Sequence, residues 1–445
     1  MNSVNTIAAI STAHGKSAIG IVRVSGNNVK KLIKTHLDDD LLPRVATNTK
    51  FIDNTGDPID DVIAIFYPSP NSYTGEDMLE VQCHGNPVIL DNVLSILCQK
   101  HSVHSKPGEF TERAFANNKI DLAQAEAVAD IINATNISAS KAALSSLQGS
   151  FSLKVELSSN ELLSLRANIE AYINFPEDDS PIITTTKTNT FIDKLLRDIR
   201  TLVESAEAGI AINQKPVIAI IGKPNVGKSS LANSLLCENR SIVSPEPGTT
   251  RDAISHDVYF DRTNITLIDT AGIRNTKNEI EKAGMSMSIE AANRSTLALY
   301  LVDDVEGFKE DDANIIEDNN IENYWIISNK IDLSSDSKPS VSYKNKKTIR
   351  ISVLKTIGLD ILMAELSKEF IPSDQTVGTA RARHLEQLNN VIEHLYMSKK
   401  YNDNHQLELV AEELRLAHQN MLQITGGDVS EDLLDRIFSE FCIGK

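Results

Sequence analysis

The segment PVIAIIGKPNVGKSS (residues 216–230) decides the fold of the middle of the chain. An apolar, strand-like run leads into the pattern G-x-x-x-x-G-K-S, whose fixed positions are Gly222, Gly227, Lys228 and Ser229. In such a loop the glycines let successive N–H groups converge on phosphate oxygens, the lysine reaches the β- and γ-phosphates, and the serine hydroxyl can bind Mg²⁺. The amphipathic stretch SSLANSLLC follows, as the helix of such a motif requires. The segment therefore predicts a nucleoside triphosphate site at the end of a strand.

Downstream motifs arrive in the order that a GTPase needs. The string GTTRD (248–252) supplies Thr250, whose hydroxyl can complete the Mg²⁺ shell while a γ-phosphate is present, which makes this segment a switch. The string NITLIDTAG ends a strand at Asp269, placed to hold Mg²⁺ through water, and continues to Gly272, whose N–H can contact the γ-phosphate. These motifs favour a hydrolysing site over a chance match to the phosphate loop.

The segment YWIISNKID delivers Asn329, Lys330 and Asp332 from the end of another apolar strand, in which Trp325 is expected to lie in the core. An aspartate at this place can accept hydrogen bonds from the guanine N1–H and 2-amino groups, which adenine cannot supply. A buried carboxylate rejects a ligand that leaves it unpaired by roughly 10⁴ or more. In IRISVLKTIG, Ser352 and the loop after it are expected to bring backbone N–H groups to the guanine O6. The chain is therefore expected to select GTP over ATP.

One catalytic residue of Ras-type GTPases has no counterpart in the sequence. Those enzymes carry a Gln directly after the Asp-x-x-Gly turn to orient the attacking water, whereas this chain has Ile273. Glu279 and Glu281, or Asn225 within the phosphate loop, are the candidates for holding the water instead. Either glutamate could equally be a solvated surface charge.

The composition is acidic: among 445 residues, 61 acidic side chains outnumber 44 basic ones, for a formal net charge of −17. At roughly 150 residues a domain, this length predicts about three domains. Any RNA contact should be local or shared with a partner, because Lys and Arg supply most of the affinity for phosphate backbones. The four widely spaced cysteines favour neither a disulfide framework nor a zinc site. Without a signal pattern or a long apolar run, the expected compartment is the cytoplasm, with no membrane contact.

The spacing of apolar and turn-forming residues changes twice along the chain's domains, from a β-like to a helical pattern and then to that of the inserted segment. This predicts three domains. Residues 1–118 alternate short β-like runs with Gly, Pro and Asn turns, which predicts a small α+β domain with a helix at 87–100. Residues 119–214 and 373–445 carry apolar side chains at helical spacing and are expected to form one helical domain. Residues 215–372 are expected to form an inserted Ras-like α/β G domain. The helical domain's expected helices are 121–148, 155–173, 190–210, 380–397, 405–423 and 428–441. Pro176, Pro181 and the Thr-rich stretch 184–190 are expected to break these helices before the insertion.

Two N-terminal strings are too polar and too rich in Gly, aromatic residues and His to be mere core. They are SYTGEDMLEVQCHGN (72–86) and KPGEFTERAFANNKIDLAQAEA (106–127). By their chemistry, the candidates to line a ligand pocket in this region are Arg23, Glu80, His84 and Lys119. The competing interpretation is that these residues are ordinary surface charges.

The two N-terminal strings, INFPEDD (173–179), the motifs GKPNVGKSS, GTTRD, DTAG and NKID, and the terminal FCIGK together resemble the MnmE (TrmE) family of tRNA-modification GTPases. The resemblance spans the chain in order, and SYTGED, CHG and FCIGK have no counterpart in other G domains. It implies an N-terminal domain that dimerises and binds 5-formyl- or methylene-tetrahydrofolate, a helical domain and an inserted G domain. It also implies a homodimer that works with the FAD-carrying partner MnmG (GidA). Together they would build the aminomethyl or carboxymethylaminomethyl group at C5 of the wobble uridine of certain tRNAs.

The resemblance also carries ligand contacts over to the N-terminal and C-terminal motifs. The implied tetrahydrofolate contacts are Arg23 in IVRVSG, Glu80 in MLEVQCHG, Lys119 in NNKIDLAQ and Lys445 in FCIGK. Cys442 matches a cysteine that the family implies in the modification chemistry. The alternative for Cys442 is a small apolar residue packed at a helix end.

In the G domain the resemblance answers the question of the missing Gln. G domains of this family pair across the dimer with K⁺ near the phosphates, the cation taking the place of an arginine finger. Glu281 matches the catalytic glutamate that orients the attacking water. The implied K⁺ ligands are Asn225, Ser244, Glu246 and Thr249, and the implied Mg²⁺ ligands are Ser229 and Thr250. The full set of expected GTP contacts is Asn225, Val226, Gly227, Lys228, Ser229, Ser230, Ser244, Pro245, Glu246, Pro247, Gly248, Thr249, Thr250, Asp269, Thr270, Ala271, Gly272, Asn329, Lys330, Asp332 and Ser352.

Two other classes of function stay open at the level of sequence. A ribosome-assembly GTPase of the Era or Der kind would bring a basic RNA-binding appendage or a second G domain, and the sequence shows neither. A G-domain scaffold, whose nucleotide only regulates partner docking, would show no stimulation of GTP hydrolysis by K⁺ over Na⁺.

Overall fold

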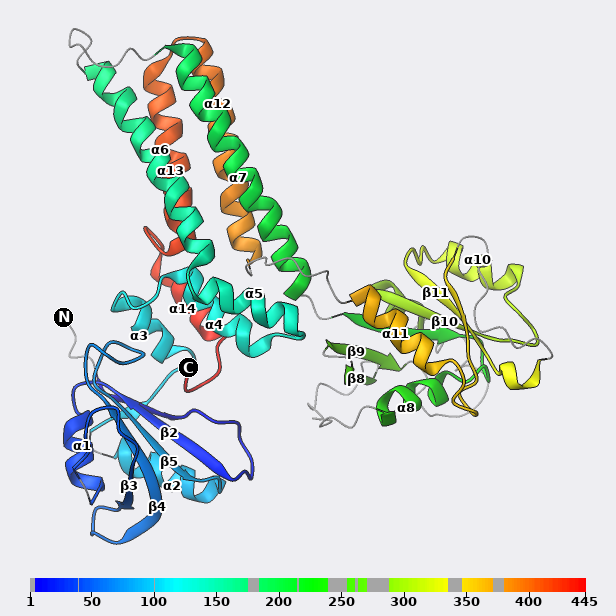
Figure 1. The fold of residues 1–445 in the computed structure, drawn as a ribbon, viewed down its shortest axis with the longest axis horizontal. Coiled ribbons are helices and arrows are strands. Elements are labelled where there is room, and N and C mark those ends of the chain that lie inside the picture. Colours follow the sequence, from blue (N-terminus) through cyan, green and yellow to red (C-terminus); the bar gives the residue numbers. More distant parts are fainter. Residues whose placement is uncertain are drawn as a thin grey trace. The chain divides into compact units, whose positions relative to one another are not determined.

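The chain folds into two compact units (Figure 1). One comprises Met1–Ile132, Ala143–Glu207 and Gly378–Lys445, and the other comprises Asn133–Ala142 and Ala208–Val377. This computed structural model describes residues 5–38, 40–99, 101–174, 184–213, 216–238, 254–260, 263–269, 288–334, 346–370 and 380–445. A long internal segment thus leaves the first unit and the chain later returns to it, as an inserted G domain requires.

The N-terminal part of the first unit is built on a six-stranded sheet with the strand order β3-β4-β5-β2-β1-β6. Neighbouring strands are antiparallel, except that β6 runs parallel to β1. The strands are β1 (Ile7–Ile10), β2 (Ile19–Ser25), β3 (Thr47–Ile52), β4 (Pro58–Tyr67), β5 (Met78–His84) and β6 (Val103–His104). Buried and more accessible side chains alternate along β2 and β5, so each strand presents an apolar face and a polar face.

Helices α1 (Val29–His36) and α2 (Pro87–Cys98) share one apolar core with the buried face of this sheet. Asn86 caps α2, because its side chain accepts a hydrogen bond from a backbone N–H in the first turn. The polar face carries Arg23 and Glu80, which the strand register places directly opposite each other. The alternation of the strands therefore brings two predicted pocket residues together.

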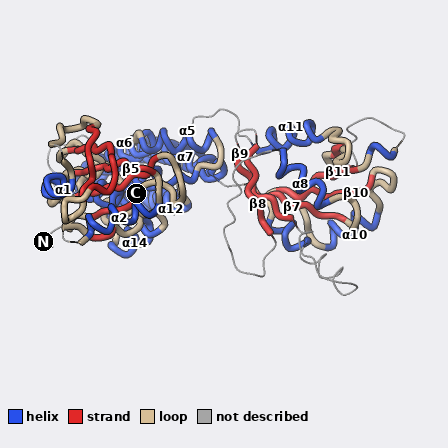
Figure 2. The backbone as a smooth tube through the Cα atoms, turned by 90° about the horizontal axis from the view of Figure 1, so that it is seen from below, coloured by secondary structure: helices blue, strands red, loops and turns tan. Residues whose placement is uncertain are grey.

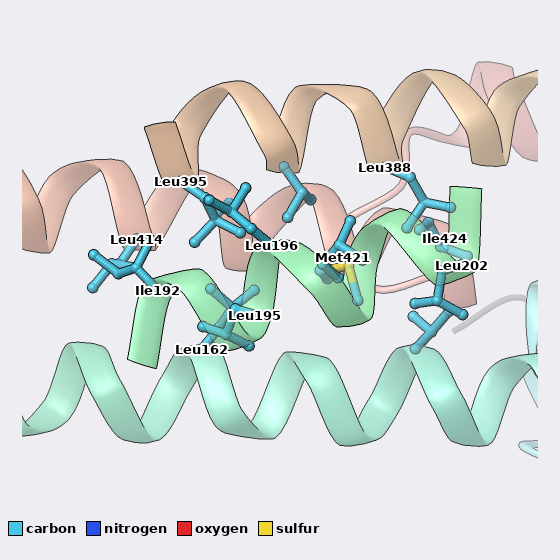
Figure 3. Packing of buried hydrophobic residues seen from close by; sticks show 14 of the residues in the cluster. Leu162, Ile192, Leu195, Leu196, Leu202, Leu388, Leu395, Leu414, Met421 and Ile424 are labelled. Carbon is cyan, nitrogen blue, oxygen red and sulfur yellow. The ribbon is translucent and has the colours of Figure 1, made fainter. Parts of the chain in front are cut away.

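Four long helices of the first unit pack side by side around a shared core (Figures 1 and 3). They are α6 (Ser150–Asn174), α7 (Thr185–Asn213), α12 (Ala382–Asp403) and α13 (Leu407–Thr425). Leu162, Leu195, Leu395 and Leu414, one from each helix, are fully buried in this core. In sequence, α6 and most of α7 precede the long segment Ala208–Val377 of the second unit, and α12 and α13 follow it, so the bundle is completed only when the chain returns.

Shorter helices lie in sequence between the N-terminal sheet and α6, and after α13. They are α3 (Glu109–Ala116), α4 (Leu122–Asn133), α5 (Ile137–Leu147) and α14 (Glu431–Ser439). An apolar cluster that includes Leu122, Phe438 and Phe441 joins α4 to α14. After α14, Ile443 forms a β-bridge with Pro107, so the C-terminal residues lie against the N-terminal part of the chain.

The second unit is built on another six-stranded sheet, with the order β12-β11-β10-β7-β9-β8. Its neighbouring strands are parallel, except that β8 is antiparallel to β9. The strands are β7 (Val217–Gly222), β8 (Ile254–Phe260), β9 (Thr263–Asp269), β10 (Leu297–Asp303), β11 (Tyr324–Asn329) and β12 (Thr348–Arg350). Side chains of β7, β10 and β11 are buried on both faces, which is typical of central strands in a parallel sheet.

Helices cover both faces of this sheet, as Figure 2 shows by their blue tubes around the red strands. α8 (Lys228–Glu238) and α11 (Leu359–Phe370) share one core with it, which also buries Trp325 as expected. Helical residues 288–294 and α10 (Glu310–Asp318) share the core on the other face. This is the expected doubly wound α/β fold, and it places the phosphate loop at the carboxyl end of a central strand.

The expectation of one helix over 121–148 is wrong. The structure divides this range into α4 and α5, with a break between Asn133 and Ile137. Asn136 explains the break, since its side chain accepts a hydrogen bond from Ala139 N at 2.7 Å and caps the second helix. Apolar spacing alone runs across this break because both helices bury small residues at similar intervals.

The expectation that the Thr-rich stretch 184–190 breaks the helices is also wrong. Thr185, Thr186, Thr188 and Thr190 lie in the first turns of α7, whereas Pro176 and Pro181 lie outside the described residues. Thr188 is buried, and Asn402 of α12 donates a hydrogen bond to Thr185 O at 3.0 Å. Packing against the bundle therefore outweighs the weak helix propensity of threonine.

Candidate GTP site and ligand pocket

The phosphate loop lies between β7 and α8, where its glycines are required by geometry. Gly222 has φ +138° and Gly227 has φ +104°, conformations that other residues rarely adopt. A side chain on Gly222 would also collide with Leu301 O, and one on Gly227 with the Asn329 amide. The loop can approach the neighbouring strands this closely only because both positions lack a Cβ, which is the arrangement that a phosphate cradle needs.

Lys228 begins α8 and its ammonium group lies over the loop. Its Nζ donates to Gly222 O at 2.7 Å and to Lys223 O at 2.8 Å. Ser229 and Ser230 follow in the first helical turn, where they are exposed. The positive end of a helix favours phosphate, so these residues fit the β- and γ-phosphates and the Mg²⁺ of a bound nucleotide.

Asn329 connects the phosphate loop to the segment expected to recognise the base. Its buried side chain donates from Nδ2 to Val226 O at 2.9 Å and accepts from Val353 N at 3.1 Å. Asp332 and Ser352 lie together, because the Ser352 hydroxyl donates to the Asp332 carboxylate at 2.5 Å. The structure thus brings the two expected base-recognition segments to the same side of the phosphate loop.

These residues line a cavity of about 600 Å³, a size typical of small-molecule sites. Its lining residues are Asn225, Gly227, Ser230, Asn233, Ser234, Asn329, Lys330, Asp332, Leu333, Ser352, Val353 and Leu354. The residues from the motifs were expected here. Asn233 and Ser234 were missed, since they lie on the following helix and belong to no motif of fixed spacing.

A buried ion pair joins the ends of β10 and β12. Arg350 contacts Asp304 at 2.5 Å, and Ser328 and Ser334 donate to the same carboxylate at 2.7 and 2.6 Å. Burial alone would raise the pKa of Asp304, but these hydrogen bonds outweigh it and lower the pKa to about 2. Asp304 is therefore a structural anion.

The other expected GTP and ion contacts lie outside the described residues. They are Ser244, Pro245, Glu246, Pro247, Gly248, Thr249, Thr250, Thr270, Ala271, Gly272 and the catalytic candidate Glu281. The backbone of Asp269 is described: it ends β9 and pairs with Ile220 of β7, two residues before Gly222. This register brings the end of the DTAG strand beside the phosphate loop.

A second cavity, of about 640 Å³, lies in the first unit on the polar face of the N-terminal sheet. Its lining residues are Arg23, Arg44, Tyr67, Asn71, Ser72, Tyr73, Met78, Glu80, Lys119, Val128, Ile131, Ile132, Leu147 and Lys445. The residues that the family resemblance implies as tetrahydrofolate contacts, Arg23, Glu80, Lys119 and Lys445, all line it. Residues more than 400 positions apart in the sequence therefore meet at one site.

Arg23 and Glu80 form the charged floor of this pocket. The Arg23 guanidinium donates to Glu80 Oε1 from Nε and NH2, at 3.0 and 2.8 Å. It also donates to Gly444 O at 3.3 Å, which ties the C-terminal segment to the sheet. Tyr67 donates to the second oxygen of Glu80 at 3.4 Å. Burial, followed by the charge of Glu80, raises the pKa of Tyr67, so its hydroxyl stays protonated and able to donate.

The loop of the SYTGED string packs against the NNK segment and fixes Lys119. Gly75, at φ +78°, leaves room for the Lys119 stem, since a Cβ there would stand 3.3 Å from its Cγ and Cδ. Asn117 donates to Thr74 O at 2.7 Å, and Lys119 Nζ donates to Pro70 O at 3.1 Å. These contacts explain why the two strings flagged in the sequence belong to one site.

His84 was expected in this pocket and does not line it. It lies on the same face of β5 as Glu80, but four residues further along, which is roughly 13 Å. Its side chain is 69% exposed and pairs with Asp60 at 2.7 Å. The surface-charge interpretation is correct for this residue.

Several pocket residues were missed because nothing in the sequence marks them. Val128, Ile131 and Ile132 of α4 supply an apolar wall whose spacing is that of ordinary helix core. Arg44 lies in a loop that carries no motif. Tyr67 ends a strand whose apolar alternation draws attention to its buried face only.

Cys442 is exposed rather than packed at a helix end. It does not line the pocket, whereas Lys445, three residues further on, does. Burial lowers the pKa of the Lys445 ammonium, and the Arg23 charge lowers it further, while Glu80 opposes the shift. Cys442 is therefore accessible and close in sequence to a pocket residue.

Within the described residues, no group of His, Cys, Asp and Glu side chains is arranged to hold a metal ion by itself. None of the described helices combines the length and apolar character needed to cross a bilayer.

Comparisons with known proteins place the whole chain in one family. The profile described as MnmE helical domain matches residues 122–442, and that described as GTP-binding protein TrmE N-terminus matches residues 6–119. A protein named tRNA modification GTPase MnmE from Coxiella burnetii (strain Dugway 5J108-111) is 40% identical, covering 99% of this chain and 98% of the relative. One of the same name from Neisseria meningitidis is 38% identical, covering 100% of both chains.

Among solved structures, Aquifex aeolicus Era bound to GDP.AlF4- is 25% identical, covering 41% of this chain and 67% of that one, with a TM-score of 0.28. A score this low carries no functional argument. The matches along the entire sequence decide the matter: this chain belongs to the MnmE family of tRNA modification GTPases.

Proposed function

We propose that this GTPase is activated by K⁺ and acts with the FAD-carrying protein MnmG to install the aminomethyl or carboxymethylaminomethyl group at C5 of the wobble uridine of certain tRNAs. The observation that carries the proposal is the 40% identity, across 99% of the chain, to a protein named tRNA modification GTPase MnmE. The two cavities support it, since one suits a guanine nucleotide and the other suits a charged, partly apolar small molecule.

In the nucleotide cavity, different residues would bind the phosphates, the base and the Mg²⁺ of GTP. Lys228 would neutralise the β- and γ-phosphates, and Asp332 would pair with guanine beside Ser352. Ser229 would bind Mg²⁺ from the first turn of α8, together with Thr250 of the switch. Mg²⁺ would supply positive charge opposite the charge that develops on the phosphates during hydrolysis.

K⁺ activation would replace an arginine finger. Asn225 is described at the rim of the nucleotide cavity, with φ +63°. Its side chain would provide one K⁺ ligand, with Ser244, Glu246 and Thr249 providing the others, and the cation would offset transition-state charge. Glu281 would orient the attacking water, and two G domains would pair across a homodimer.

The second cavity would hold the one-carbon donor, 5-formyl- or methylene-tetrahydrofolate. The Arg23–Glu80 pair offers both donors and acceptors at the pocket floor, which suits the edge of a pterin ring. Lys119 and Lys445 offer positive charge. The donor would supply a one-carbon unit, and the chain's own residues would hold it and exclude water on the apolar side formed by α4. Cys442 would take part in the modification from outside the pocket.

The experiment that tests this function is nucleoside analysis of tRNA from cells that lack this gene, complemented with the wild-type chain or with Arg23→Ala. We expect the wobble modification to disappear in the deletion strain, to return with the wild type and to stay absent with R23A. Arg436→Ala, which changes an exposed arginine of the same unit, is the matched control and should restore the modification. Unmodified uridine with the wild type present, or normal modification without the gene, would refute the proposal. Immature ribosomal subunits with intact modification would point to the Era or Der class.

A further inference from the structure

The pocket on the N-terminal sheet is strongly cationic, although the chain as a whole is acidic. Its charged side chains are the cations of Arg23, Arg44, Lys119 and Lys445 and the single acidic side chain of Glu80. Glu80 is already paired with Arg23 at 2.8 Å. In the described part of the chain, neither Arg44 nor Lys119 has a carboxylate within ion-pair distance. The pocket therefore holds more positive charge than its own residues compensate.

Arg44 is held in place by its backbone. Its N–H donates to Phe66 O at 2.7 Å, at the end of β4, and its φ is +60°. Its guanidinium stands 6.0 Å from the centroid of the Tyr67 ring, and NH1 donates to Asn71 O at 3.4 Å. A backbone fixed to a strand end positions this exposed side chain at the pocket without an ion pair.

Lys119, in the NNK segment, contacts the same loop as Arg44. Its Nζ donates to Pro70 O, so Arg44 and Lys119 donate to the carbonyls of two consecutive residues, Pro70 and Asn71. A hydrogen bond to a neutral carbonyl leaves the net charge of each cation in place. Two uncompensated cations beside one short loop form a site for an anion, and for two negative charges better than for one.

We infer that Arg44, with Lys119, binds the carboxylates of the glutamyl tail of the pocket's ligand and sets a preference for ligands that carry this tail. The inference rests on the proposed function, since it takes the ligand to be a tetrahydrofolate. The Arg23–Glu80 pair holds the ring end, the apolar side chains of α4 cover the middle, and the planar Arg44 fork meets a carboxylate with two parallel hydrogen bonds.

The test compares two ligands on the full-length chain by isothermal titration calorimetry: 5-formyl-tetrahydrofolate, which has one glutamate, and 5-formyl-tetrahydropteroate, which lacks it. Arg44→Gln should weaken binding of the glutamylated ligand about 10- to 100-fold, as for the loss of a hydrogen-bonded charge. Its affinity for the tailless ligand should change little. Arg44→Lys should lie in between, since it keeps the charge without the fork. Arg436→Gln, an exposed arginine away from the pocket, is the matched control.

The outcomes separate the inference from the function on which it rests. If the wild type binds the glutamylated ligand and R44Q binds it equally well, the tail assignment is wrong and the proposed function stands. If R44Q weakens the binding of both ligands to the same extent, Arg44 affects the pocket without binding the glutamyl tail, and the inference is again wrong. If the wild type binds neither ligand, the tetrahydrofolate proposal itself fails, and the inference fails with it.

Discussion

At the residue scale, Asp332 is the side chain on which nucleotide choice depends. It lines the nucleotide cavity and is positioned by the Ser352 hydroxyl at 2.5 Å. Asp332→Asn should replace an acceptor by a donor, which suits the 2-oxo group of xanthine in place of the 2-amino group of guanine. We expect kcat/KM for GTP to fall by roughly 10³-fold or more while hydrolysis of XTP becomes measurable. Asp360→Asn, an exposed aspartate of the same unit, serves as the control. Unchanged selectivity in D332N would remove this residue from base recognition.

Glu281 belongs to the residue scale as well, although it lies outside the described residues. Since a water-orienting group acts in the transition state, Glu281→Ala should lower kcat for GTP hydrolysis by about 10²-fold and leave the Kd for GTP nearly unchanged. Glu279→Ala, in the same string, should have little effect on either quantity. Stopped-flow binding of a fluorescent GTP analogue and single-turnover hydrolysis measure the two separately. A Kd that weakens in step with the rate would contradict the assignment.

Residues that share a cavity were predictable from sequence only where a motif fixes their spacing. Gly227 of the phosphate loop, Asn329 and Asp332 were expected together and do line one cavity, because their motifs place them at neighbouring strand ends. Arg44 was not found, since a loop arginine with a positive φ belongs to no motif. His84 was wrongly included because the polar composition of its string marked it, and composition does not give a residue's position along the strand.

At the element scale, a buried polar cluster joins α4 to the beginning of α12. Glu126 and His384 are each 2% exposed, their side chains meet at 2.7 Å, and Arg383 contacts the same carboxylate at 2.9 Å. Burial alone would raise the pKa of Glu126, but His384 and Arg383 outweigh it and lower the pKa from 4.5 to about 2. Because the folded-state pKa lies below the ordinary one, this carboxylate stabilises the fold above about pH 4.5, and the contribution is lost as the pH falls toward 2.

Glu126→Ala should therefore lower the free energy of unfolding of the first unit by roughly 3–5 kcal/mol near neutral pH, as for the loss of one partner of a buried pair. The difference from wild type should shrink as the pH falls through the range given above. Urea unfolding followed by far-UV circular dichroism measures this. Trp325, the only tryptophan, reports the second unit by fluorescence and should show an unchanged transition. A pH-independent difference would mean that the carboxylate's charge is not responsible.

The four-helix core makes a second prediction at this scale. Leu195 of α7 is fully buried among side chains of the neighbouring helices (Figure 3), so Leu195→Ala should cost roughly 2–5 kcal/mol of unfolding free energy. Leu153 of α6 is 58% exposed, and Leu153→Ala should change stability by no more than about 0.5 kcal/mol. The same urea experiment compares them. Equal effects of the two substitutions would show that this core is not packed as described.

Element boundaries were predictable where an apolar period is uninterrupted. The helices of the bundle and the strands of both sheets follow from such periods. The break between α4 and α5 and the threonine-rich start of α7 did not follow. One depends on the Asn136 cap, and the other on a hydrogen bond from Asn402 of α12 to Thr185 O, across more than 200 residues of sequence. In both cases the helix boundary is set by a hydrogen bond that the pattern of apolar residues does not reveal.

At the scale of the whole molecule, the chain carries a GTP cavity in one unit and a cationic small-molecule pocket in the other. The lining of the pocket includes residues from the first and the last parts of the sequence. The pocket is therefore complete only when the chain has returned from the second unit. Motif order predicted the α/β fold of the segment that carries the phosphate loop, whereas the division into three domains stays a prediction beside the two compact units of the structure. The account as a whole depends on GTP hydrolysis that is switched on by K⁺ in paired G domains.

GTP hydrolysis measured in KCl and in NaCl at equal ionic strength, over a range of protein concentrations, tests that claim most directly. We predict that K⁺ raises the rate at least about tenfold, a modest part of what an arginine finger supplies, and that specific activity rises with protein concentration as G domains pair. Asn225→Gly, which the φ of +63° at this position tolerates, should abolish the difference between the salts. Equal rates in the two salts, with a specific activity independent of concentration, would contradict the account.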